Sequence, residues 1–263
     1  MIDASRGAAL VTGASSGIGE AFARRLVRDG YDVILVARRG ELLEKLAEEL
    51  RGRNGVRVAV EVADLANGED VARLEKLLAE SEDVTALVNN AGYATGDRFA
   101  DAEIEGQVDM VMVHDIATIR LIRAALPGMI ARHRGDIINV SSVAGLIPWG
   151  HATYCASKAF LVAFTEALHM ELRGGGVRVQ ALCPGFTHTG FHEAWGVDTD
   201  HTPGFMWMSA DDVVDESFAA LRRGKVVFVP GAKNRVYHAL MRAVPRGALF
   251  KLMAATRRAA GRE

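Results

Sequence analysis

Tyr154 and Lys158 are four residues apart in a segment whose apolar residues recur at helical spacing. Side chains at i and i+4 share one face of a helix, so the two groups should be neighbours. A free tyrosine has a pKa of about 10, and a nearby ammonium favours the phenolate and lowers that pKa. Ser142, just after an apolar run, could hydrogen-bond a carbonyl oxygen held near the phenol. These residues predict a site that moves a proton on or off a carbonyl or alcohol oxygen.

Tyr-x-x-x-Lys alone is frequent by chance, and a solvated helix start is the alternative. The surrounding elements support the site, because short apolar runs alternate with helical patterns along the chain. Such alternation predicts an α/β fold, a doubly wound parallel sheet with helices on both faces. We expect strands at residues 8–12, 32–37, 56–62, 85–89, 136–140, 177–183 and 225–229. Besides the helix that carries Tyr154, we expect helices at 18–29, 41–50, 68–79, 107–132 and 210–223.

The length of 263 residues fits one large domain, and 49% hydrophobic with 24% charged residues is typical of a globular protein. The formal net charge of −2 predicts no general attraction to nucleic acid. The first residues lack the apolar core of a signal peptide, and no apolar run approaches the ~18 residues of a membrane span. We expect a cytoplasmic protein in which Cys155 and Cys183 are reduced thiols and no metal is bound.

A glycine-rich turn follows the first expected strand and precedes the first expected helix. Its spacing is Gly-x-x-x-Gly-x-Gly, which differs from the usual Gly-x-Gly-x-x-Gly of dinucleotide-binding folds. Glycines permit a tight turn and let the backbone approach a pyrophosphate at the helix N-terminus. The position of the turn in an alternating chain predicts dinucleotide binding by Gly13, Ser15, Ser16, Gly17, Ile18 and Gly19.

Four motifs occur in one order along residues 8–230. They are Thr-Gly-x-x-x-Gly-Ile-Gly at 12–19, Asn-Asn-Ala-Gly at 89–92, the Ser142, Tyr154 and Lys158 set, and Pro-Gly-x-x-x-Thr at 184–189. Together they resemble the short-chain dehydrogenase/reductase (SDR) family. The resemblance implies a single Rossmann-type domain over residues 1–263, with about seven parallel strands. It also implies hydride transfer between a nicotinamide cofactor and a carbonyl or hydroxyl group.

The resemblance implies roles for the matching residues. Tyr154 would be the general acid/base, Lys158 would lower its pKa and bind the nicotinamide ribose, and Ser142 would polarise the substrate oxygen. Ser141 is the alternative for the last role. The gap of twelve residues from Ser142 to Tyr154 is one short of the family spacing, which indicates a trimmed loop. The cofactor would also meet Asp64 at its adenine amine, with Leu65 beside it, and Asn90, Ala91, Gly92, Pro184, Gly185, Thr187 and Thr189.

One position departs from the family pattern. The family places an asparagine of a proton relay in the long helix, where this chain has His114 followed by Asp115. Histidine donates, accepts and titrates near neutral pH, so His114 could serve the relay itself as a fourth catalytic residue. The alternative is a helix histidine packed against the sheet with a local partner. The departure also raises a rival function, a non-catalytic NADP-binding regulator or interaction protein that retains the fold.

Charge predicts the cofactor. An acidic residue after the second strand would bind a ribose 2′-hydroxyl, but Arg38 and Arg39 stand there and no acid comes before Glu41. Two arginines at a helix N-terminus oppose its dipole, which is easier to understand if they face an anion. We therefore expect NADP(H), whose 2′-phosphate they would bind, to be favoured over NAD(H). Two solvated surface arginines are the alternative.

Large apolar residues crowd residues 190–208, a segment that covers the substrate in the resembling family. We expect them to accept a bulky hydrophobic carbonyl or secondary alcohol, with the packing of this lid onto itself as the alternative. The expected substrate residues are Tyr93, Trp149, His151, Phe186, Phe191, Trp195 and Trp207.

The C-terminal extension is basic. From Arg222 to Glu263 there are eleven Lys or Arg and one acid, with apolar residues between them and Pro245 interrupting the pattern. Residues 231–263 could form two short amphipathic helices that contact anionic membrane, or they could cover a dimer surface or the substrate mouth. We also expect a homodimer through the two long helices, on the apolar residues Met110, Met112, Ile119, Ile122, Leu161 and Val162.

Overall fold

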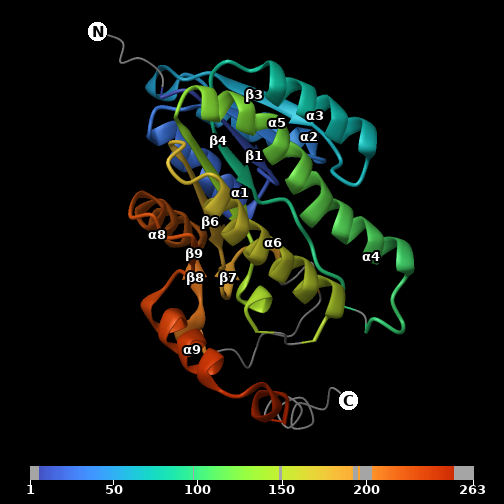
Figure 1. The fold of residues 1–263 in the computed structure, drawn as a ribbon. Helices are drawn as coiled ribbons and strands as arrows, with labels where there is room; N and C mark the ends of the chain where they lie inside the picture. Colours follow the sequence, from blue (N-terminus) through green and yellow to red (C-terminus); the bar gives the residue numbers. More distant parts are fainter. Residues whose placement is uncertain (1–5, 97, 148–149, 192–194, 196–202, 252–263) are drawn as a thin grey trace.

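The computed structural model describes residues 6–96, 98–147, 150–191, 195 and 203–251. Seven parallel strands form one sheet in the order β3-β2-β1-β4-β5-β6-β9, which confirms the predicted fold class (Figure 1). The strands are β1 (Ala8–Thr12), β2 (Asp32–Ala37), β3 (Val58–Val62), β4 (Val84–Asn89), β5 (Gly135–Val140), β6 (Val177–Leu182) and β9 (Val227–Phe228). The third strand begins two residues later than expected, after a short 3₁₀ turn at Arg53–Gly55. The last strand has only two of the five expected residues.

Helices cover both faces of the sheet (Figure 1). They are α1 (Gly17–Arg28), α2 (Gly40–Leu50), α3 (Gly68–Glu80), α4 (Ile104–Val111), α5 (Ala117–Ala131), α6 (Ala152–Glu171) and α8 (Ala210–Arg222). Successive residues of a strand point to opposite faces. Ala9 and Val11 of β1 therefore join the core under α1, α2 and α8, whereas Ala8 and Leu10 join the core under α3, α5 and α6.

The strand order reverses at β1, which pairs with β2 on one side and with β4 on the other. In open parallel sheets the crevice beyond the carboxyl ends of such strands is the usual ligand site. β1 ends at Thr12 and β4 at Asn89, so the glycine-rich turn and the Asn-Asn-Ala-Gly motif meet at this crevice.

The helix expected at residues 107–132 is longer and irregular. α4 and α5 are joined by a π-helical turn, Met112–Ile116, in which the hydrogen bonds span five residues instead of four. Single π-turns inside α-helices are frequent at functional sites. Here the turn carries His114 and Asp115, and it buries both side chains.

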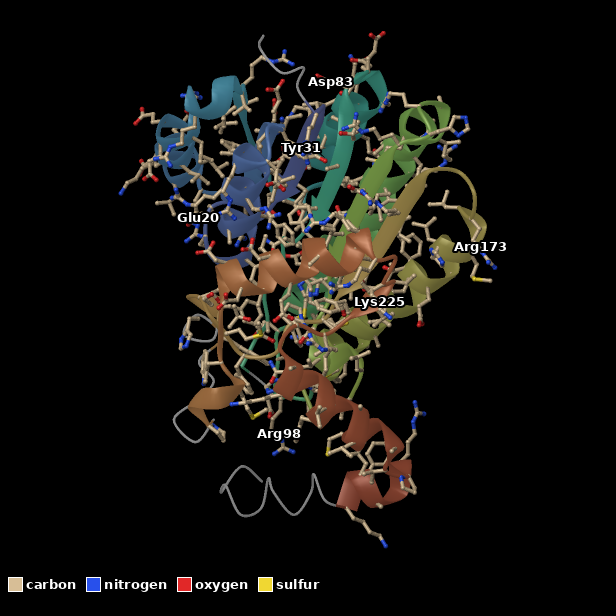
Figure 2. The ribbon with its side chains drawn as sticks, turned by 90° about the vertical axis from the view of Figure 1, so that its left-hand side faces the viewer. Glu20, Tyr31, Asp83, Arg98, Arg173 and Lys225 are labelled. Atoms are coloured by element: carbon tan, nitrogen blue, oxygen red, sulfur yellow. The ribbon has the colours of Figure 1, made fainter. Side chains whose placement is uncertain are left out.

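The chain after the sheet lies beyond the carboxyl ends of the strands. α9 (Ala232–Ala243) is the lower helix in both views, at the opposite end of the molecule from Asp83, which precedes β4 (Figure 2). Pro245 separates α9 from a second helical segment at residues 246–251, as the sequence predicts. A two-residue parallel ladder, β7 (Thr187–His188) with β8 (Met208–Ser209), joins the ends of the expected lid. None of the helices in the described ranges is long and apolar enough to cross a membrane.

Candidate active site

The glycine-rich turn is held by hydrogen bonds between the ends of β1 and β4. The Thr12 hydroxyl accepts from the backbone N–H groups of Asn90 and Ala91 at 2.9 and 3.0 Å. The Asn90 amide donates to the carbonyl oxygens of Thr12 and Gly13 at 3.0 and 3.2 Å. A Cβ at Gly19 would lie 2.2 Å from the Gly13 oxygen, so glycine is required where α1 approaches the turn. Asn90 therefore braces the turn as well as facing the cavity.

The turn leaves the N-terminus of α1 open to a cavity of about 1100 Å³. Gly13 and Gly17 have φ of +66° and +59°, left-handed conformations that favour glycine. Ser15, Ser16, Gly17 and Ile18 line the cavity wall at this point. Unpaired N–H groups at a helix N-terminus, with no side chain in the way, fit a pyrophosphate.

Both arginines after β2 line the same cavity. Arg39 donates to the hydroxyl oxygens of Ser15 at 2.9 Å and Ser16 at 2.8 Å. Arg38 is exposed, and its guanidinium lies 4.0 Å from the Asp64 carboxylate. The two guanidinium groups and two hydroxyl groups form a cluster of donors that fits a phosphate at the ribose end.

The adenine end is closed by the turn after β3. Asp64 and Leu65 line the cavity there. The Asp64 carboxylate accepts from the Ala66 backbone N–H at 3.0 Å, and the Asp64 N–H donates to Asp70 at 2.8 Å. These bonds fix the turn and leave the second carboxylate oxygen of Asp64 near Arg38.

Ser142 and Tyr154 meet at the other end of the cavity. Tyr154 is in the first turn of α6, and its phenol is hydrogen-bonded to the Ser142 hydroxyl. That hydroxyl also accepts from the Ala144 N–H at 3.1 Å, which holds Ser142 as the cap of a 3₁₀ turn. Ser141 is committed elsewhere, since its hydroxyl donates to the Lys158 carbonyl oxygen at 2.7 Å. The geometry therefore favours Ser142 over Ser141 beside the phenol.

The protonation of Tyr154 differs from the sequence-based expectation. Burial raises the pKa of Tyr154 to about 12, and the Ser142 hydrogen bond lowers it only in part. The Lys158 ammonium lies 5.8 Å from the centre of the ring, too far to offset the burial. The phenol therefore holds its proton at neutral pH.

Lys158 lies behind the cavity wall. Its ammonium donates to the Val140 carbonyl oxygen at 2.9 Å, and burial lowers its pKa to about 8, while Asp115 acts in the opposite direction. A Cβ at Gly92 would lie 2.7 Å from His114 Nε2 and 3.4 Å from Lys158 Nζ, so this glycine lets the Asn-Asn-Ala-Gly loop pass close to His114, beside the amine. Gly145 serves α6 in the same way, because a Cβ there would lie 2.5 Å from the Lys158 carbonyl oxygen.

Both ring nitrogens of His114 form hydrogen bonds inside the protein. Nε2 accepts from the Tyr93 backbone N–H at 3.1 Å, and Nδ1 lies 2.9 Å from the Ser157 hydroxyl. Ser157 in turn donates to the Tyr154 carbonyl oxygen at 3.0 Å. This direction of bonding requires Nδ1 to carry the proton, and burial lowers the pKa of His114 well below its usual value. The geometry supports a packed, neutral histidine with local partners more than a titrating relay.

Asp115 follows His114 in the π-turn and is also buried. Its Oδ1 finds no hydrogen-bond partner among the described residues. Burial raises the pKa of Asp115 to about 7, and the Lys158 charge acts against that rise. A buried carboxyl and a buried amine thus influence each other behind Tyr154.

Aromatic rings from three segments surround Tyr154. The rings of Trp195, Phe191 and His114 lie 5.2, 6.1 and 5.9 Å from it, centre to centre. His151 contacts Trp195 at 4.8 Å, and the Trp195 indole donates to the Thr95 carbonyl oxygen at 2.7 Å. These contacts bury the phenol and form an apolar wall around Tyr154.

The predicted residues divide between the cavity wall and its support. Gly19, Lys158 and His114 do not line the cavity but hold residues that do. Trp207 is also off the wall and packs on Phe186 and His188 at 5.4 and 4.8 Å. Trp149 lies outside the described residues. The wall includes the remaining predicted residues, namely Ala91, Tyr93, Pro184, Gly185, Thr187, Thr189 and those placed above.

The wall residues that were not predicted include two polar residues of α9, Asn234 and His238. They are spaced i and i+4, which is the signal that two polar residues share a helix face, but a sequence does not show toward what that face turns. Their position supports the interpretation that the C-terminal extension covers the substrate mouth. Both cysteines are buried thiols that form no disulfide, and no group of metal ligands occurs within the described part of the chain.

Comparison with known proteins identifies the family. A family model described as short chain dehydrogenase matches residues 7–199. The chain is 42% identical over 178 residues to the NADP-dependent 3-hydroxy acid dehydrogenase YdfG of Salmonella typhi, which covers 67% of this chain and 71% of that protein. It is 37% identical over 186 residues to the very-long-chain 3-oxoacyl-CoA reductase of Anas platyrhynchos, covering 69% of this chain and 60% of the relative.

Two solved structures are similar over nearly the whole chain. One is a short-chain dehydrogenase from Sphingobium yanoikuyae in complex with NADPH, with a TM-score of 0.83, 34% identity, and coverage of 94% of this chain and 95% of that one. The other is the bulky-bulky ketone specific alcohol dehydrogenase from Comamonas testosteroni, with a TM-score of 0.77, 31% identity, and coverage of 91% and 95%. The protein belongs to the short-chain dehydrogenase family, whose members are oxidoreductases.

Proposed function

We propose that the protein is an NADPH-dependent reductase that converts bulky hydrophobic ketones into secondary alcohols. One observation carries the proposal: a single cavity joins the glycine turn and the two arginines at one end to the Ser142–Tyr154 pair and its aromatic wall at the other. Its volume of about 1100 Å³ leaves room for a large substrate beside a dinucleotide.

The cofactor is NADP(H). The cluster of Arg38, Arg39, Ser15 and Ser16 supplies two guanidinium groups and two hydroxyl groups at the ribose end, which suits a 2′-phosphate. YdfG of Salmonella typhi is named as NADP-dependent, and the Sphingobium yanoikuyae structure is a complex with NADPH. When bound, the cofactor supplies the hydride.

The residues of the chain handle the oxygen of the substrate. Ser142 and Tyr154 both hydrogen-bond the ketone oxygen, which polarises the carbonyl and fixes its position. As hydride reaches the carbon, the Tyr154 phenol gives its proton to the oxygen, and an alcohol results. A phenol that is protonated at neutral pH suits this direction of reaction. Lys158, charged below a pKa of about 8, stabilises the phenolate left behind.

The aromatic residues of the cavity wall indicate the substrate class. Phe191, Trp195 and His151 surround the reacting position with apolar surface, which favours ketones with a large apolar group. The Comamonas testosteroni structure is titled as specific for bulky-bulky ketones, and the Anas platyrhynchos relative is named as a reductase of very-long-chain 3-oxoacyl-CoA. These names support a hydrophobic ketone.

The test is NADPH consumption with aryl ketones, bicyclic ketones and 3-oxoacyl thioesters. Tyr154→Phe should reduce turnover by about 10²–10⁴-fold, the usual contribution of a positioned acid, and should leave NADPH affinity nearly unchanged. Tyr31→Phe, at the far end of the molecule (Figure 2), is the matched control and should keep full activity. Tight NADPH binding with no reduction of any ketone would instead support a non-catalytic regulator.

A further inference from the structure

α9 is an amphipathic helix whose polar face is turned toward the protein and whose apolar face is turned toward solvent. Asn234 and His238, one turn apart, are each 4% exposed and line the cavity. Val236 and Leu240 are 61% and 65% exposed. A helix that packs on a protein body for stability buries its apolar stripe, so this arrangement points to a different use for the inward face.

His238 carries an unpaired polar atom inside the protein. Its Nδ1 is shielded from solvent and finds no hydrogen-bond partner among the described residues. More than nine in ten buried polar groups in proteins have a partner, so an unpaired nitrogen is unusual. Because the His238 side chain belongs to the cavity wall, a small rotation of its ring would bring this nitrogen to a ligand in the cavity. The nearest ring is Tyr237, 5.3 Å away and nearly perpendicular, which supplies no bond to Nδ1.

The imidazole is neutral at physiological pH, because burial lowers the pKa of His238 to about 4. A neutral imidazole has one donor nitrogen and one acceptor nitrogen, so it suits a hydroxyl or a carbonyl oxygen. Arg235, next to Asn234 in α9, is engaged elsewhere: it donates to the Glu216 carboxylate at 2.9 Å and to the Val229 carbonyl oxygen at 3.2 Å. The subsite therefore suits an uncharged group.

Asn234 borders the cofactor end of the cavity. A Cβ at Gly185 would lie 3.2 Å from the Asn234 amide nitrogen, and Gly185 belongs to the segment expected to meet the cofactor. His238 follows one turn later, about 6 Å along α9. The pair thus spans the distance from the cofactor segment into the space left for substrate.

We propose that His238, with Asn234 beside it, recognises a second, uncharged oxygen of the ketone substrate, a hydroxyl or carbonyl remote from the reacting carbonyl. The proposal rests on the proposed function and narrows its substrate class. It makes the C-terminal extension a specificity element of the site.

The experiment compares 4-phenyl-2-butanone with derivatives that carry a hydroxyl at the 3- or 4-position of the ring, or a carboxylate at the 4-position. The wild-type protein should reduce one hydroxylated ketone with a kcat/KM about tenfold above the parent ketone, mainly through KM, and should not favour the carboxylate. His238→Leu should remove this preference by lowering kcat/KM for the hydroxylated ketone alone. His238→Gln, which keeps a hydrogen bond, should restore part of it.

Two controls separate the outcomes. Leu240→Gln changes the outward face of α9 and should leave the preference intact. NADPH affinity, measured by fluorescence titration, should be equal in wild type and His238→Leu; a loss would show that His238 binds the cofactor, and the proposal would be overturned. Equal losses for parent and hydroxylated ketones would also overturn it.

A failure of the proposed function would be distinguishable from a failure of the subsite. If no ketone oxidises NADPH, calorimetric binding of the same ketones to the NADPH-loaded protein still tests the subsite. Tighter binding of a hydroxylated ketone that His238→Leu abolishes would sustain the subsite without the reaction. Binding that ignores the hydroxyl would refute it.

Discussion

The imidazole Nε2 of His114 accepts a hydrogen bond from the backbone N–H of Tyr93 at 3.1 Å, so a side chain of the long helix holds the loop after β4. The opposite nitrogen contacts Ser157, which reaches the Tyr154 carbonyl oxygen. His114 thus ties the loop that borders the cofactor to the helix that carries the tyrosine. At the position where the family pattern has an asparagine, His114 therefore makes a bracing contact on both sides.

His114→Phe should destabilise the protein and lower activity together. The change leaves the Tyr93 N–H buried without a partner, which costs about 1–3 kcal/mol. Thermal or urea unfolding should show this loss, and His169→Phe, near the end of α6, should show little. In wild type, log kcat/KM should show no ionisation that belongs to His114 between pH 5 and 7, because burial keeps the pKa of His114 well below its usual value. An ionisation near pH 6.5 that vanishes in His114→Phe would revive the relay.

Asp115→Asn should narrow the pH range of activity. The ionised Asp115 raises the pKa of Lys158, which burial otherwise lowers to about 8. Without that carboxylate the ammonium loses its proton at lower pH, so the alkaline fall of kcat/KM should move to lower pH. Rates measured from pH 6 to 10 would show the shift, and Asp109→Asn, on the exposed side of α4, should not produce it. An unchanged or raised midpoint would contradict the coupling.

Loss of the two arginines should weaken NADPH binding and spare NADH. Arg38→Ala with Arg39→Ala removes both guanidinium groups from the ribose end of the cavity, where each charged hydrogen bond contributes about 1.5–3 kcal/mol. Titration with each cofactor would measure the two affinities, with Arg53→Ala as an exposed control. Equal losses for NADPH and NADH would show that these residues do not contact the 2′-phosphate.

We expect a homodimer through the two long helices, although not through most of the residues named for it. Met110, Ile122, Leu161 and Val162 are buried within the protomer, and Met112 and Ile119 are partly covered. The exposed large apolar residues of α4, the π-turn and α6 are instead Ile104, Val108, Ile116, Phe160 and Met170. Large exposed apolar groups on adjoining helices favour a partner surface.

Phe160→Glu combined with Ile116→Lys should give a monomer by light scattering at micromolar concentration. Leu240→Glu, which changes the outward face of α9, is the matched control and should leave the dimer intact. A wild-type protein that is already monomeric, or a double variant that remains dimeric, would contradict this interface.

Much of the fold was predictable because the alternation of apolar runs and helical patterns reports the sheet directly. The site residues on loops after β1, β4 and β5 were predictable because each lies in a short contiguous motif. The pKa of Tyr154 was not predictable, since its burial depends on Phe191, Trp195 and His114, which come from other segments. Helical spacing groups Asn234 with His238, but only packing decides that this polar face turns inward.

The π-turn has a consequence for altering the gene. A π-turn holds one residue more than an α-helical turn, so deleting a single codon within Met112–Ile116 would convert it to regular α-geometry and leave α4 and α5 close to their present orientation. The change would be confined to the turn, where it would move His114 away from the Tyr93 N–H. A chimaera that takes an unbroken α-helix from a relative would therefore keep the packing of α5 and lose the contact that His114 makes.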